Sequence, residues 1–565
     1  MIVGIDLGTT HSLIGYYDGQ APRLIPNALG EYLTPSAVSV DGDGQLMIGR
    51  VAHERLLTHP GDSVATFKRW MGSQRETALG PRKYRPEELS ALVLRALLDD
   101  ARAHLGREIA EAVISVPAYF GDSQRKATRA AGELAGIKVE RLINEPTAAA
   151  LAYGLQERVD GSTFIVLDLG GGTFDVSILE IFDGVMQVHA SAGDNRLGGE
   201  DFLDVLVDAF CRDHQLDVQK LSAQENGQLR LRMESLKQQL SRHDRAGLQI
   251  QLASRACEWE IAEARFHELA NPLLQRLRMP IERALRDARL TPDQLQEVVM
   301  VGGASRMPLF TRLVARMLGR LPLRHVNPDQ AIALGACVVA GMKARDESLE
   351  EVVMTDVCPY TLGVGTGRID DHGRETTGHF SPIIERNATV PVSRAETYAP
   401  LHDNADHVVL EIYQGESPRV IHNVQLGTLR VPMPKNKTRD QNTFEVRFTY
   451  DVNGVLQVEA QVLATGERHE LILEGNPGVL TQDEIRERLS QLEALKIHPR
   501  EDQANLAVIA RAERLYEDHL DLRPMLHDWL ARFMGVLESQ DRERIARHRG
   551  ELASALDDLE QRVGA

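Results

Sequence analysis

Apolar positions along residues 1–345 alternate between two spacings. Short runs of mostly β-branched residues, each ending at a Gly, Pro or Asp turn, predict strands. Apolar positions at helical spacing predict the helices between them. The predicted strands are Ile2–Ile5, Val113–Val116, Phe164–Leu167 and Val298–Val301, and the predicted helices are Glu87–Leu105, Gln124–Ala135, Leu229–Leu240 and Phe266–Ala288. This alternation is typical of an α/β domain, to which we assign residues 1–350.

The spacing changes after this domain. Apolar and polar residues alternate in Phe444–Val452 and in Leu456–Val462, and the Asn453-Gly454 between them is a strong hairpin signal. Val408–Gln414 predicts a further strand. Helical spacing then returns, opened by Thr481–Glu484, which has the character of a capping box. We therefore predict a connector at residues 351–357, an all-β domain at 358–480 and a short helical domain at 481–565.

One strand–turn–strand unit occurs twice. Ile2–Thr10 resembles Phe164–Thr173, because in each an apolar strand runs into Asp-Leu-Gly and a Thr-bearing turn. A second strand follows each turn, at Ser12–Tyr17 and Asp175–Ile181. A repeated tight turn would by itself explain the glycines, since Gly adopts positive φ at little cost. Recurrence of the whole unit in each half of the domain favours a shared functional site.

Composition narrows the class of protein. The 565 residues include 64 Lys+Arg and 82 Asp+Glu, and this net charge of −18 argues against a general nucleic-acid binder. The four cysteines have no CxxC spacing, which predicts neither a disulfide framework nor a zinc site. No apolar run is long enough for a membrane span, and Ile332–Met342, interrupted by two glycines, suits a buried helix. The N-terminus lacks the features of a signal peptide, so we expect a cytoplasmic protein without a membrane partner.

The two glycine turns have the composition of anion-binding loops. Successive backbone N–H groups in Gly8-Thr9-Thr10 and in Gly170–Thr173 can converge on a phosphate. If the two turns face one another, they can hold the β- and γ-phosphates of one nucleotide. Asp6 and Asp168, where the strands end, are carboxylates of the kind that meet Mg²⁺ through its waters, and Asp175 could orient the attacking water or a second cation. A nucleotide and Mg²⁺ are the expected ligands, with K⁺ as a further candidate ion.

Two other segments suit a nucleoside. Gly302-Gly303 follows a predicted strand, where the backbone can approach a nucleotide and Arg306 can stack on a purine. Ordinary strand–helix packing is the alternative there. Glu234, Lys237 and Ser241 share one face of a predicted helix, which is either a clamp for ribose and adenine or a solvated face.

These segments together resemble the heat-shock protein 70 chaperone family of the DnaK type, over essentially the whole chain. The motifs that carry the resemblance are Ile5–Thr10, Val116–Phe120, Asn144–Ala150, Asp168–Asp175, Gly193-Asp194 with Leu197–Phe202, and Gly302–Pro308. The resemblance implies an actin-like (ribonuclease H-like) two-lobed ATPase domain, a linker, a β-sandwich domain and an α-helical lid. It implies a monomeric chaperone, acting in the stress response, whose ATP hydrolysis controls its affinity for extended apolar segments of unfolded proteins.

The resemblance also implies roles for single residues. Lys68, Glu145, Thr173 and Asp175 match the residues that act on the γ-phosphate and the attacking water. Pro117 and Arg125 match a switch pair that relays the nucleotide state, together with Asp356 at the end of the connector. The expected nucleotide-binding residues are Gly8, Thr9, Thr10, His11, Gly170, Gly171, Gly172, Glu234, Lys237, Ser241, Gly302, Gly303, Arg306 and Asp329, and the expected metal-site residues are Asp6 and Asp168.

Binding of other proteins is implied in the same way. Val364, Tyr398, Val408, Leu410 and Leu471 match an apolar groove that takes an extended peptide by β-type recognition, and the sandwich core is the alternative for them. Arg141, Asn144 and Thr147 match the docking surface for J-domain co-chaperones, beside Asp356.

The chain departs from the usual family pattern at several points. His11 stands where Asn is usual, and its protonation predicts a pH-sensitive nucleotide affinity. The connector Val353–Asp356 is less apolar than the family's leucine-rich linker. Residues 242–265 form a shorter segment than in the DnaK type, which leaves the need for a nucleotide exchange factor open. Gly367 and Leu401 occupy the arch over the peptide groove and predict fast peptide release. With the short helical tail, these departures resemble the specialised HscC branch.

Other functions fit fewer of the parts. A small-molecule kinase on the same two-lobed fold explains both glycine turns but leaves residues 358–565 without a task, and so does a filament-forming actin-like protein. A chaperone helper that does not hydrolyse ATP conflicts with the intact Lys68, Thr173 and Asp175. The ATP-driven chaperone uses every part of the chain, and the kinase is the alternative.

Overall fold

The structure is a computed structural model, in which packing divides the chain into two units. Met1–Thr361 and Glu385–Val390 form the first, and Leu362–Ile384 and Pro391–Ala565 form the second. The described residues are 1–155, 159–182, 185–252, 255–323, 325–344, 355–369, 374–451, 454–473, 503–519 and 522–563. Residues 358–361, which we assigned to the β domain, pack with the first unit. The predicted boundaries at 350 and 480, Asn453 of the predicted hairpin, and Thr481–Glu484 lie outside the described residues.

The first lobe of unit 1 is built on a mixed sheet of order β11-β10-β1-β2-β3, with β4 beside β2. β1 is parallel to β10 and antiparallel to β2, so the first predicted hairpin is present. The strands are β1 (Ile2–Asp6), β2 (His11–Tyr17), β3 (Pro22–Leu24), β4 (Thr34–Pro35), β10 (Glu111–Val116) and β11 (Lys138–Asn144). Helices α2 (Pro86–Leu105) and α3 (Asp122–Leu134) pack against it through a core that includes Ile5, Leu94 and Ile114.

Local sequence sets the ends of α2. Pro86 stands in the first turn, where its missing N–H costs no hydrogen bond. The Glu88 side chain accepts a hydrogen bond from the Arg85 N–H at 2.6 Å, and Gly106 ends the helix at a φ of 64°. A smaller part of the lobe consists of α1 (Arg50–Thr58), β5 (Ala37–Val40), β6 (Leu46–Ile48), β7 (Ser63–Ala65), β8 (Thr77–Leu79) and β9 (Arg82–Tyr84).

The second lobe repeats the hairpin in a sheet of order β14-β13-β12-β17. β12 pairs antiparallel with β13 and parallel with β17, as β1 does with β2 and β10. The strands are β12 (Thr163–Leu169), β13 (Phe174–Phe182), β14 (Val185–Asp194) and β17 (Glu297–Val301). The other elements are α5 (Gly199–Asp213), α6 (Ala223–Leu240), the hairpin β15 (Arg245–Leu252) and β16 (Arg255–Ala262), α7 (Glu263–Leu269), α8 (Asn271–Ala288) and α9 (Pro308–Leu318).

The single helix expected at Phe266–Ala288 is two helices. α7 ends at Leu269 and α8 begins at Asn271, with Pro272 in its first turn. Proline lacks the N–H that would continue the hydrogen-bond ladder of α7, and its ring clashes with the preceding turn, whereas it fits the first turn of a new helix. The apolar spacing runs across this break, which is why the spacing alone does not reveal it.

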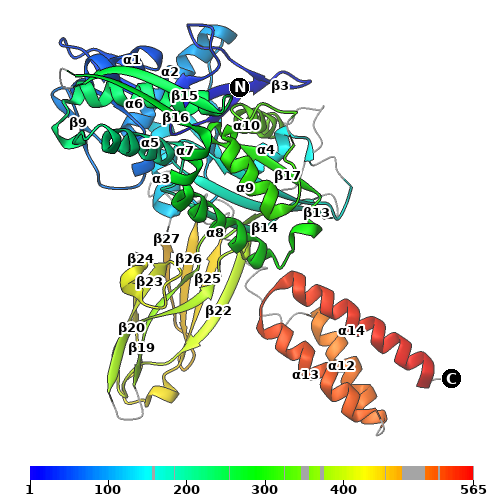
Figure 1. Ribbon diagram of the computed structural model, residues 1–565. Helices are drawn as coiled ribbons and strands as arrows, with labels where there is room; N and C mark the ends of the chain where they lie inside the picture. Colours follow the sequence, from blue (N-terminus) through cyan, green and yellow to red (C-terminus); the bar gives the residue numbers. More distant parts are fainter. Residues whose placement is uncertain are drawn as a thin grey trace. The chain divides into compact units, whose positions relative to one another are not determined.

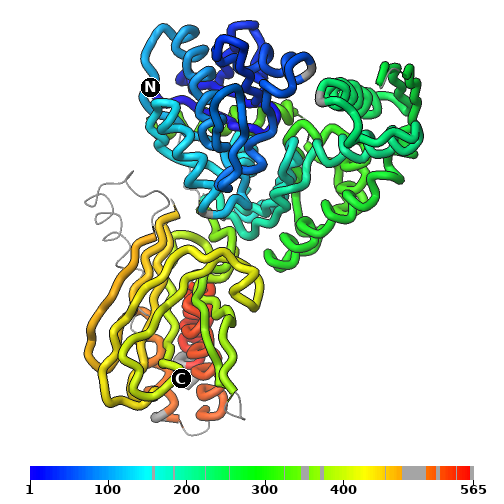
Figure 2. Tube along the Cα trace, turned by 90° about the vertical axis from the view of Figure 1, so that its left-hand side faces the viewer, coloured from blue at the N-terminus to red at the C-terminus, as the bar shows by residue number. Residues whose placement is uncertain are grey.

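Helices α4 (Glu145–Ala152) and α10 (Ala331–Lys343) share a core with one face of both sheets. A Cβ on Gly4 of β1 would lie 2.3 Å from the backbone nitrogen of Cys337, and one on Gly335 would lie 1.8 Å from the carbonyl oxygen of Ala148. Glycine at both positions therefore permits the close contact of α10 with β1 and α4. The predicted burial of the segment Ile332–Met342 is confirmed for Ile332, Ala333 and residues 335–341. Figure 2 shows the first lobe in blue and cyan beside the second in green.

The end of the connector forms part of unit 1. β18 (Asp356–Val357) pairs antiparallel with β21 (Thr389–Val390). The Thr355 N–H donates to the Met186 carbonyl of β14 at 3.1 Å. The short segment that holds Arg386 and Asn387 therefore belongs with unit 1 and not with the strands on either side of it.

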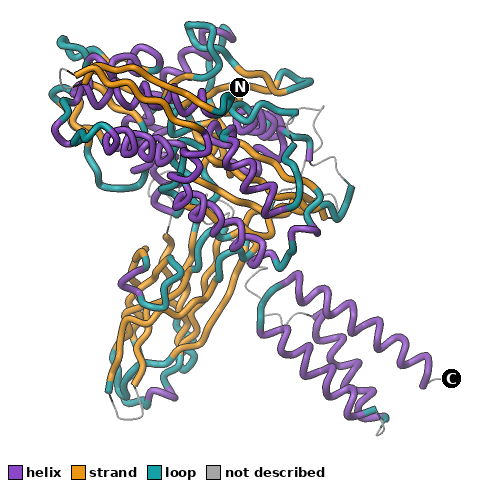
Figure 3. Tube along the Cα trace, viewed as in Figure 1, coloured by secondary structure: helices purple, strands orange, loops and turns teal. Residues whose placement is uncertain are grey.

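Unit 2 contains two four-stranded antiparallel sheets, of order β20-β19-β23-β24 and β22-β25-β26-β27 (Figure 3). Alternate residues of β25, such as Phe444, Val446 and Phe448, are buried, as the two-residue spacing predicts. The strands are β19 (Leu362–Ile369), β20 (Glu375–Ile384), β22 (Val392–Tyr398), β23 (His407–Gln414), β24 (Val424–Pro432), β25 (Phe444–Tyr450), β26 (Leu456–Val462) and β27 (Arg468–Leu473).

The C-terminal part of unit 2 is helical. α12 (Gln503–Asp518), α13 (Arg523–Glu538) and α14 (Arg542–Val563) pack around a core of their own that includes Leu526, Phe533 and Leu556 (Figure 1). In the part of the chain that the structure describes, no helix has the length and apolar character that a membrane crossing requires. The four cysteines are buried free thiols.

Candidate functional site: an acidic centre between two glycine turns

The two glycine turns meet in the structure. A Cβ on Gly171 would lie 2.4 Å from Cγ2 of Thr10, and one on Gly172 would lie 3.0 Å from Cγ2 of Thr9. The turn of the first lobe and the turn of the second therefore face one another in contact, which is the arrangement that shared phosphate binding requires. Glycine at Gly171 and Gly172 leaves the room for this approach.

Four carboxylates and one lysine gather beside these turns. Asp6 ends β1, Asp168 and Asp175 lie on β12 and β13, and Glu145 begins α4. Lys68, from the short 3₁₀ segment Phe67–Trp70, donates to Glu145 Oε1 at 2.8 Å, with both side chains buried. The structure thus brings together the predicted metal-site residues with three of the predicted catalytic residues. The fourth, Thr173, is buried in the second turn.

The acidic centre has more negative charge than its single lysine balances. Burial, and then the charge of Glu145, raises the pKa of Asp6 to about 7 and that of Asp175 to about 7. Burial and the neighbouring carboxylates, Glu145 foremost, also raise the pKa of Asp168. Among the described residues, Oδ2 of Asp168 and Oδ2 of Asp175 are buried without a hydrogen-bond partner.

These observations fit a cation at the centre. Unpaired buried carboxylate oxygens beside two phosphate-type loops are suitable ligands for Mg²⁺ and its waters. In the described parts of the chain, no three His, Cys, Asp or Glu side chains are arranged to ligate a metal directly.

The predicted nucleoside residues lie on the second lobe near the acidic centre. A Cβ on Gly302, at a φ of 81°, would lie 2.6 Å from Oδ1 of Asp168. Arg306 donates to Oδ2 of Asp329 at 2.6 Å, so its guanidinium is held in an ion pair at the surface. Stacking of Arg306 on a purine stays a prediction.

The helix α6 contributes the other nucleoside residues. Lys237 pairs with Glu234 at 2.7 Å and donates to the Gly199 carbonyl at 2.8 Å. The Lys237 side chain is buried, which argues against the alternative of a fully solvated helix face. The Ser241 hydroxyl donates to the Lys237 carbonyl at 3.3 Å.

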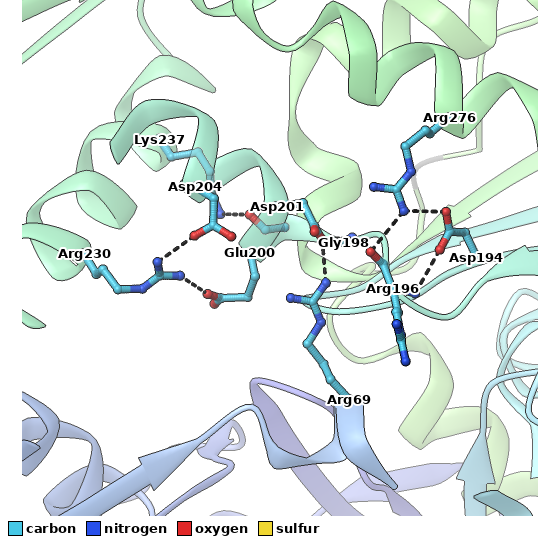
Figure 4. Close-up of polar contacts among 11 residues, drawn as sticks. Arg69, Asp194, Arg196, Gly198, Glu200, Asp201, Asp204, Arg230, Lys237 and Arg276 are labelled. Carbon is cyan, nitrogen blue, oxygen red and sulfur yellow. Dashed lines mark hydrogen bonds and ion pairs between the residues drawn. The ribbon is translucent and has the colours of Figure 1, made fainter. Parts of the chain in front are cut away.

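An ion pair joins the lobes beside the second turn, and sequence reasoning missed it. Arg69 of the first lobe donates to Oδ2 of Asp201 in α5 at 2.7 Å, as Figure 4 shows. The same Asp201 oxygen accepts the Gly198 N–H at 2.8 Å. Gly198 packs on the turn, since a Cβ there would lie 2.4 Å from the Gly172 nitrogen. The available signals were the position of Arg69 next to Lys68 and the motif segment Leu197–Phe202.

His11 lies at the exposed start of β2, after the first turn. Surrounding protein atoms lower the pKa of the His11 imidazole, and His53 and Arg50 of α1 act in the same direction. Asp329 and Glu234 of the second lobe oppose this shift. The imidazole is consequently neutral at pH 7, so the predicted pH sensitivity belongs to pH values below the ordinary histidine pKa.

The predicted switch residues form a chain of hydrogen bonds with the connector. Asp356 accepts from Asn144 Nδ2 at 2.6 Å, and Asn144 Oδ1 accepts from Arg125 at 2.8 Å. Arg125 also donates to the carbonyls of Ala118 and Phe120, in the segment that follows the buried Pro117. The backbone N–H of Tyr119, in the middle of that segment, donates to Oδ1 of Asp175 at 2.9 Å. The connector end and the acidic centre are thus joined through residues 118–120.

The predicted J-domain residues lie on or next to β11 and α4. Asn144 and Thr147 are buried, and Asn144 is bound to Asp356. Burial lowers the pKa of Arg141, and the charge of Asp356 acts in the opposite direction. Their role in docking a partner stays a prediction.

The predicted peptide-groove residues are spread over both sheets of unit 2. Val364 and Leu410 are buried, and Tyr398, Val408 and Leu471 are half-buried. The Tyr398 hydroxyl lies 3.0 Å from that of Ser381. At the predicted arch, a Cβ on Gly367 would lie 3.0 Å from Cδ1 of Leu401, so the leucine occupies the space that a side chain at Gly367 would fill.

Comparison with known proteins decides the family. The chain matches the family model described as "Hsp70 protein" over residues 2–80 and 74–563. The chain belongs to the Hsp70 family. It is also similar to "Chaperone protein dnaK3" of Thermosynechococcus vestitus, with 38% identity over 561 residues that cover 91% of this chain and 79% of that protein.

Membership of the Hsp70 family settles several of the predictions. The predicted fold class of a two-lobed actin-like ATPase domain, a β-sandwich and a helical region is confirmed. Hsp70 proteins are ATP-dependent chaperones, so this chain is an ATPase of that class, and the small-molecule kinase receives no support. Assignment to the HscC branch, a cytoplasmic location and a role in the stress response stay predictions.

Proposed function

We propose that the chain binds extended apolar peptides in its β-sandwich and that ATP hydrolysis in unit 1 controls the affinity for them. The observation that carries this proposal is the hydrogen-bonded path from Asp356, through Asn144 and Arg125, to residues 118–120 and Asp175. A change at the acidic centre can alter how the connector end is bound only if the two are in contact, and this path supplies that contact.

The acidic centre supports hydrolysis of ATP to ADP and phosphate. Phosphoryl transfer needs charge neutralisation at the γ-phosphate and a water in line with the bond that breaks. Lys68 is the cation available for the γ-phosphate, and Glu145 holds its ammonium group in position at 2.8 Å. Asp175, with an unused buried oxygen, is suited to orient the water, and the Thr173 hydroxyl to donate to a phosphate oxygen.

Mg²⁺, associated with Asp6 and Asp168, would neutralise charge on the phosphates. The protein residues have a separate task, which is to position the carboxylates that would surround the ion. Ser115 donates to Oδ1 of Asp6 at 2.7 Å and fixes that carboxylate. A K⁺ ion is a further candidate for the same excess of negative charge.

Control of peptide affinity requires contacts that differ between nucleotide states. Asp356 and Thr355 supply contacts at the connector end, through Asn144 and the Met186 carbonyl. We infer that ATP favours these contacts and an open peptide site, and that hydrolysis releases them and favours peptide retention. A J-domain co-chaperone that binds near Arg141, Asn144 and Thr147 would act on the same contacts, since Asn144 is one of them. We further infer a monomer, and leave open whether release of ADP needs an exchange factor.

Steady-state ATP hydrolysis with and without an extended apolar peptide tests the proposal. We expect basal hydrolysis and a severalfold stimulation by peptide. Lys68→Ala should abolish both rates while ATP still binds, because the phosphate loops are intact. Removal of Lys68 leaves Glu145 buried without its cation, so the Lys68→Ala, Glu145→Gln double variant controls for destabilisation. Hydrolysis that peptide does not change would reject the coupling, and hydrolysis retained by Lys68→Ala would reject its role.

A further inference from the structure

Tyr360, three residues after β18, makes contacts that neither the proposed coupling path nor the site residues include. Its ring packs against that of Tyr119, with centroids 4.6 Å apart and the ring planes tilted by 41°. Its hydroxyl donates to the Tyr119 carbonyl at 3.0 Å. Both residues belong to unit 1. Tyr360, just after the connector, therefore holds the 118–120 segment at a second point, in addition to the path through Asp356.

The backbone of Tyr119 is hydrogen-bonded at both its N–H and its carbonyl. Its N–H donates to Oδ1 of Asp175, and its carbonyl accepts from Tyr360 and from Asn195 Nδ2, both at 3.0 Å. The Tyr119 ring is fixed as well, since Arg283 lies over it and donates to its hydroxyl at 3.2 Å. The Tyr119 N–H donates to one Asp175 oxygen, so its position affects where the other, Oδ2, points.

The Tyr360 hydroxyl stays protonated and can therefore donate a hydrogen bond. Burial, then the neighbouring Tyr119 and Asp175, raises the pKa of the Tyr360 phenol above its usual value. The group consequently keeps its proton at physiological pH. Asn195 also donates weakly to the Tyr360 oxygen at 3.4 Å, which fits a hydroxyl whose own proton is directed to the Tyr119 carbonyl.

We infer that Tyr360 is a positioning residue for ATP hydrolysis, which holds the Tyr119 peptide so that Asp175 is correctly oriented when the connector end is bound to unit 1. The inference rests on the proposed function, because it assumes that Asp175 orients the attacking water. It adds a second, shorter link to the acidic centre: one hydrogen bond to the carbonyl of Tyr119, the residue whose backbone N–H binds Asp175.

Tyr360→Phe in the full chain tests the inference, because it removes the hydroxyl and keeps the ring. We expect hydrolysis of pre-bound ATP in a single turnover to slow by about fivefold, the effect of one lost hydrogen bond, with unchanged ATP affinity. Tyr153→Phe is the matched control. Tyr153 is a buried tyrosine of the same unit whose hydroxyl also donates to a backbone carbonyl, that of Val326 at 3.2 Å. That variant should hydrolyse ATP at the normal rate.

A double-mutant cycle with Asn195→Ala separates positioning from general destabilisation. Both side chains donate to the Tyr119 carbonyl, so their effects on the hydrolysis rate should be non-additive, whereas two unrelated losses of stability would add. If wild type hydrolyses ATP and Tyr360→Phe matches Tyr153→Phe, the inference on Tyr360 is wrong and the proposed function stands. If wild type itself does not hydrolyse ATP, the proposed function fails.

Discussion

Single residues at the acidic centre illustrate what sequence can and cannot predict. Asp6 and Asp168 could be found from the repeated strand–acid–glycine unit, because a duplicated motif is visible in the chain. Lys68 and Glu145 carry no such signal and became candidates only through the family resemblance. The contacts among Tyr119, Asn195 and Tyr360 were missed, since they join residues as far as 241 positions apart along the chain.

The histidine at the first turn predicts a pH dependence that an asparagine would lack. Since its pKa is lowered, His11 should gain a proton only below the ordinary histidine range, and the added positive charge should then favour the nucleotide phosphates. We expect the ratio of ATP affinities, wild type over His11→Asn, to rise as pH falls below about 6.5 and to stay constant between pH 7 and 8. Calorimetric titration of both proteins at several pH values measures this ratio.

The same shift has a consequence for stability. A histidine whose folded pKa lies below its unfolded value binds fewer protons when folded, so its contribution to the free energy of unfolding is lost as pH falls through that interval. Wild type without nucleotide should therefore lose more stability than His11→Asn on acidification below about pH 6.5. A ratio of ATP affinities, wild type over His11→Asn, that stays constant down to pH 5 would rule out the role of His11 in pH-dependent nucleotide binding.

At the scale of elements, periodicity predicts most of the ATPase unit well. The strands β1, β10, β12 and β17 and the helices α2 and α3 lie where the apolar spacing puts them, because each buries one face against a core. The division of α7 from α8 is a local effect of Pro272 that spacing does not report. How the two hairpins meet depends on contacts between Gly171 and Thr10, which no local pattern encodes.

The ion pair between η2, the 3₁₀ segment Phe67–Trp70, and α5 predicts a role in nucleotide release. Arg69 and Asp201 are about one-fifth exposed, and they form an ion pair between the lobes beside the second turn. Asp201→Asn keeps an acceptor for the Gly198 N–H but removes the charge, so we expect ADP to dissociate about fivefold faster. Stopped-flow displacement of a fluorescent ADP analogue measures the rate.

Asp204→Asn is the control for that variant. Asp204 lies on the same helix and pairs with Arg230 at 2.6 Å, but both residues belong to the second lobe (Figure 4). Its ADP release should be that of wild type. An unchanged release rate in Asp201→Asn, or an equal change in both variants, would exclude the ion pair as a link that retains nucleotide.

For the whole molecule, the order of an α/β part, a β-rich part and a helical part follows from the changes in apolar spacing along the chain. What the spacing did not reveal is that residues 358–361 and 385–390 pack with the ATPase unit, although they flank strands of the β-sandwich. These short segments carry no periodicity of their own. Their assignment comes from long-range contacts, such as those of Arg386 and Asn387 with Asp287, each at 3.0 Å.

The central claim is that the nucleotide bound at the acidic centre sets the affinity of the β-sandwich for peptide. The most direct measurement is the dissociation rate of a labelled, extended apolar peptide from the full chain after addition of excess unlabelled peptide with ATP or with ADP. We predict release at least tenfold faster with ATP, because ATP favours binding of the connector end to unit 1. Equal release rates with the two nucleotides would contradict the account.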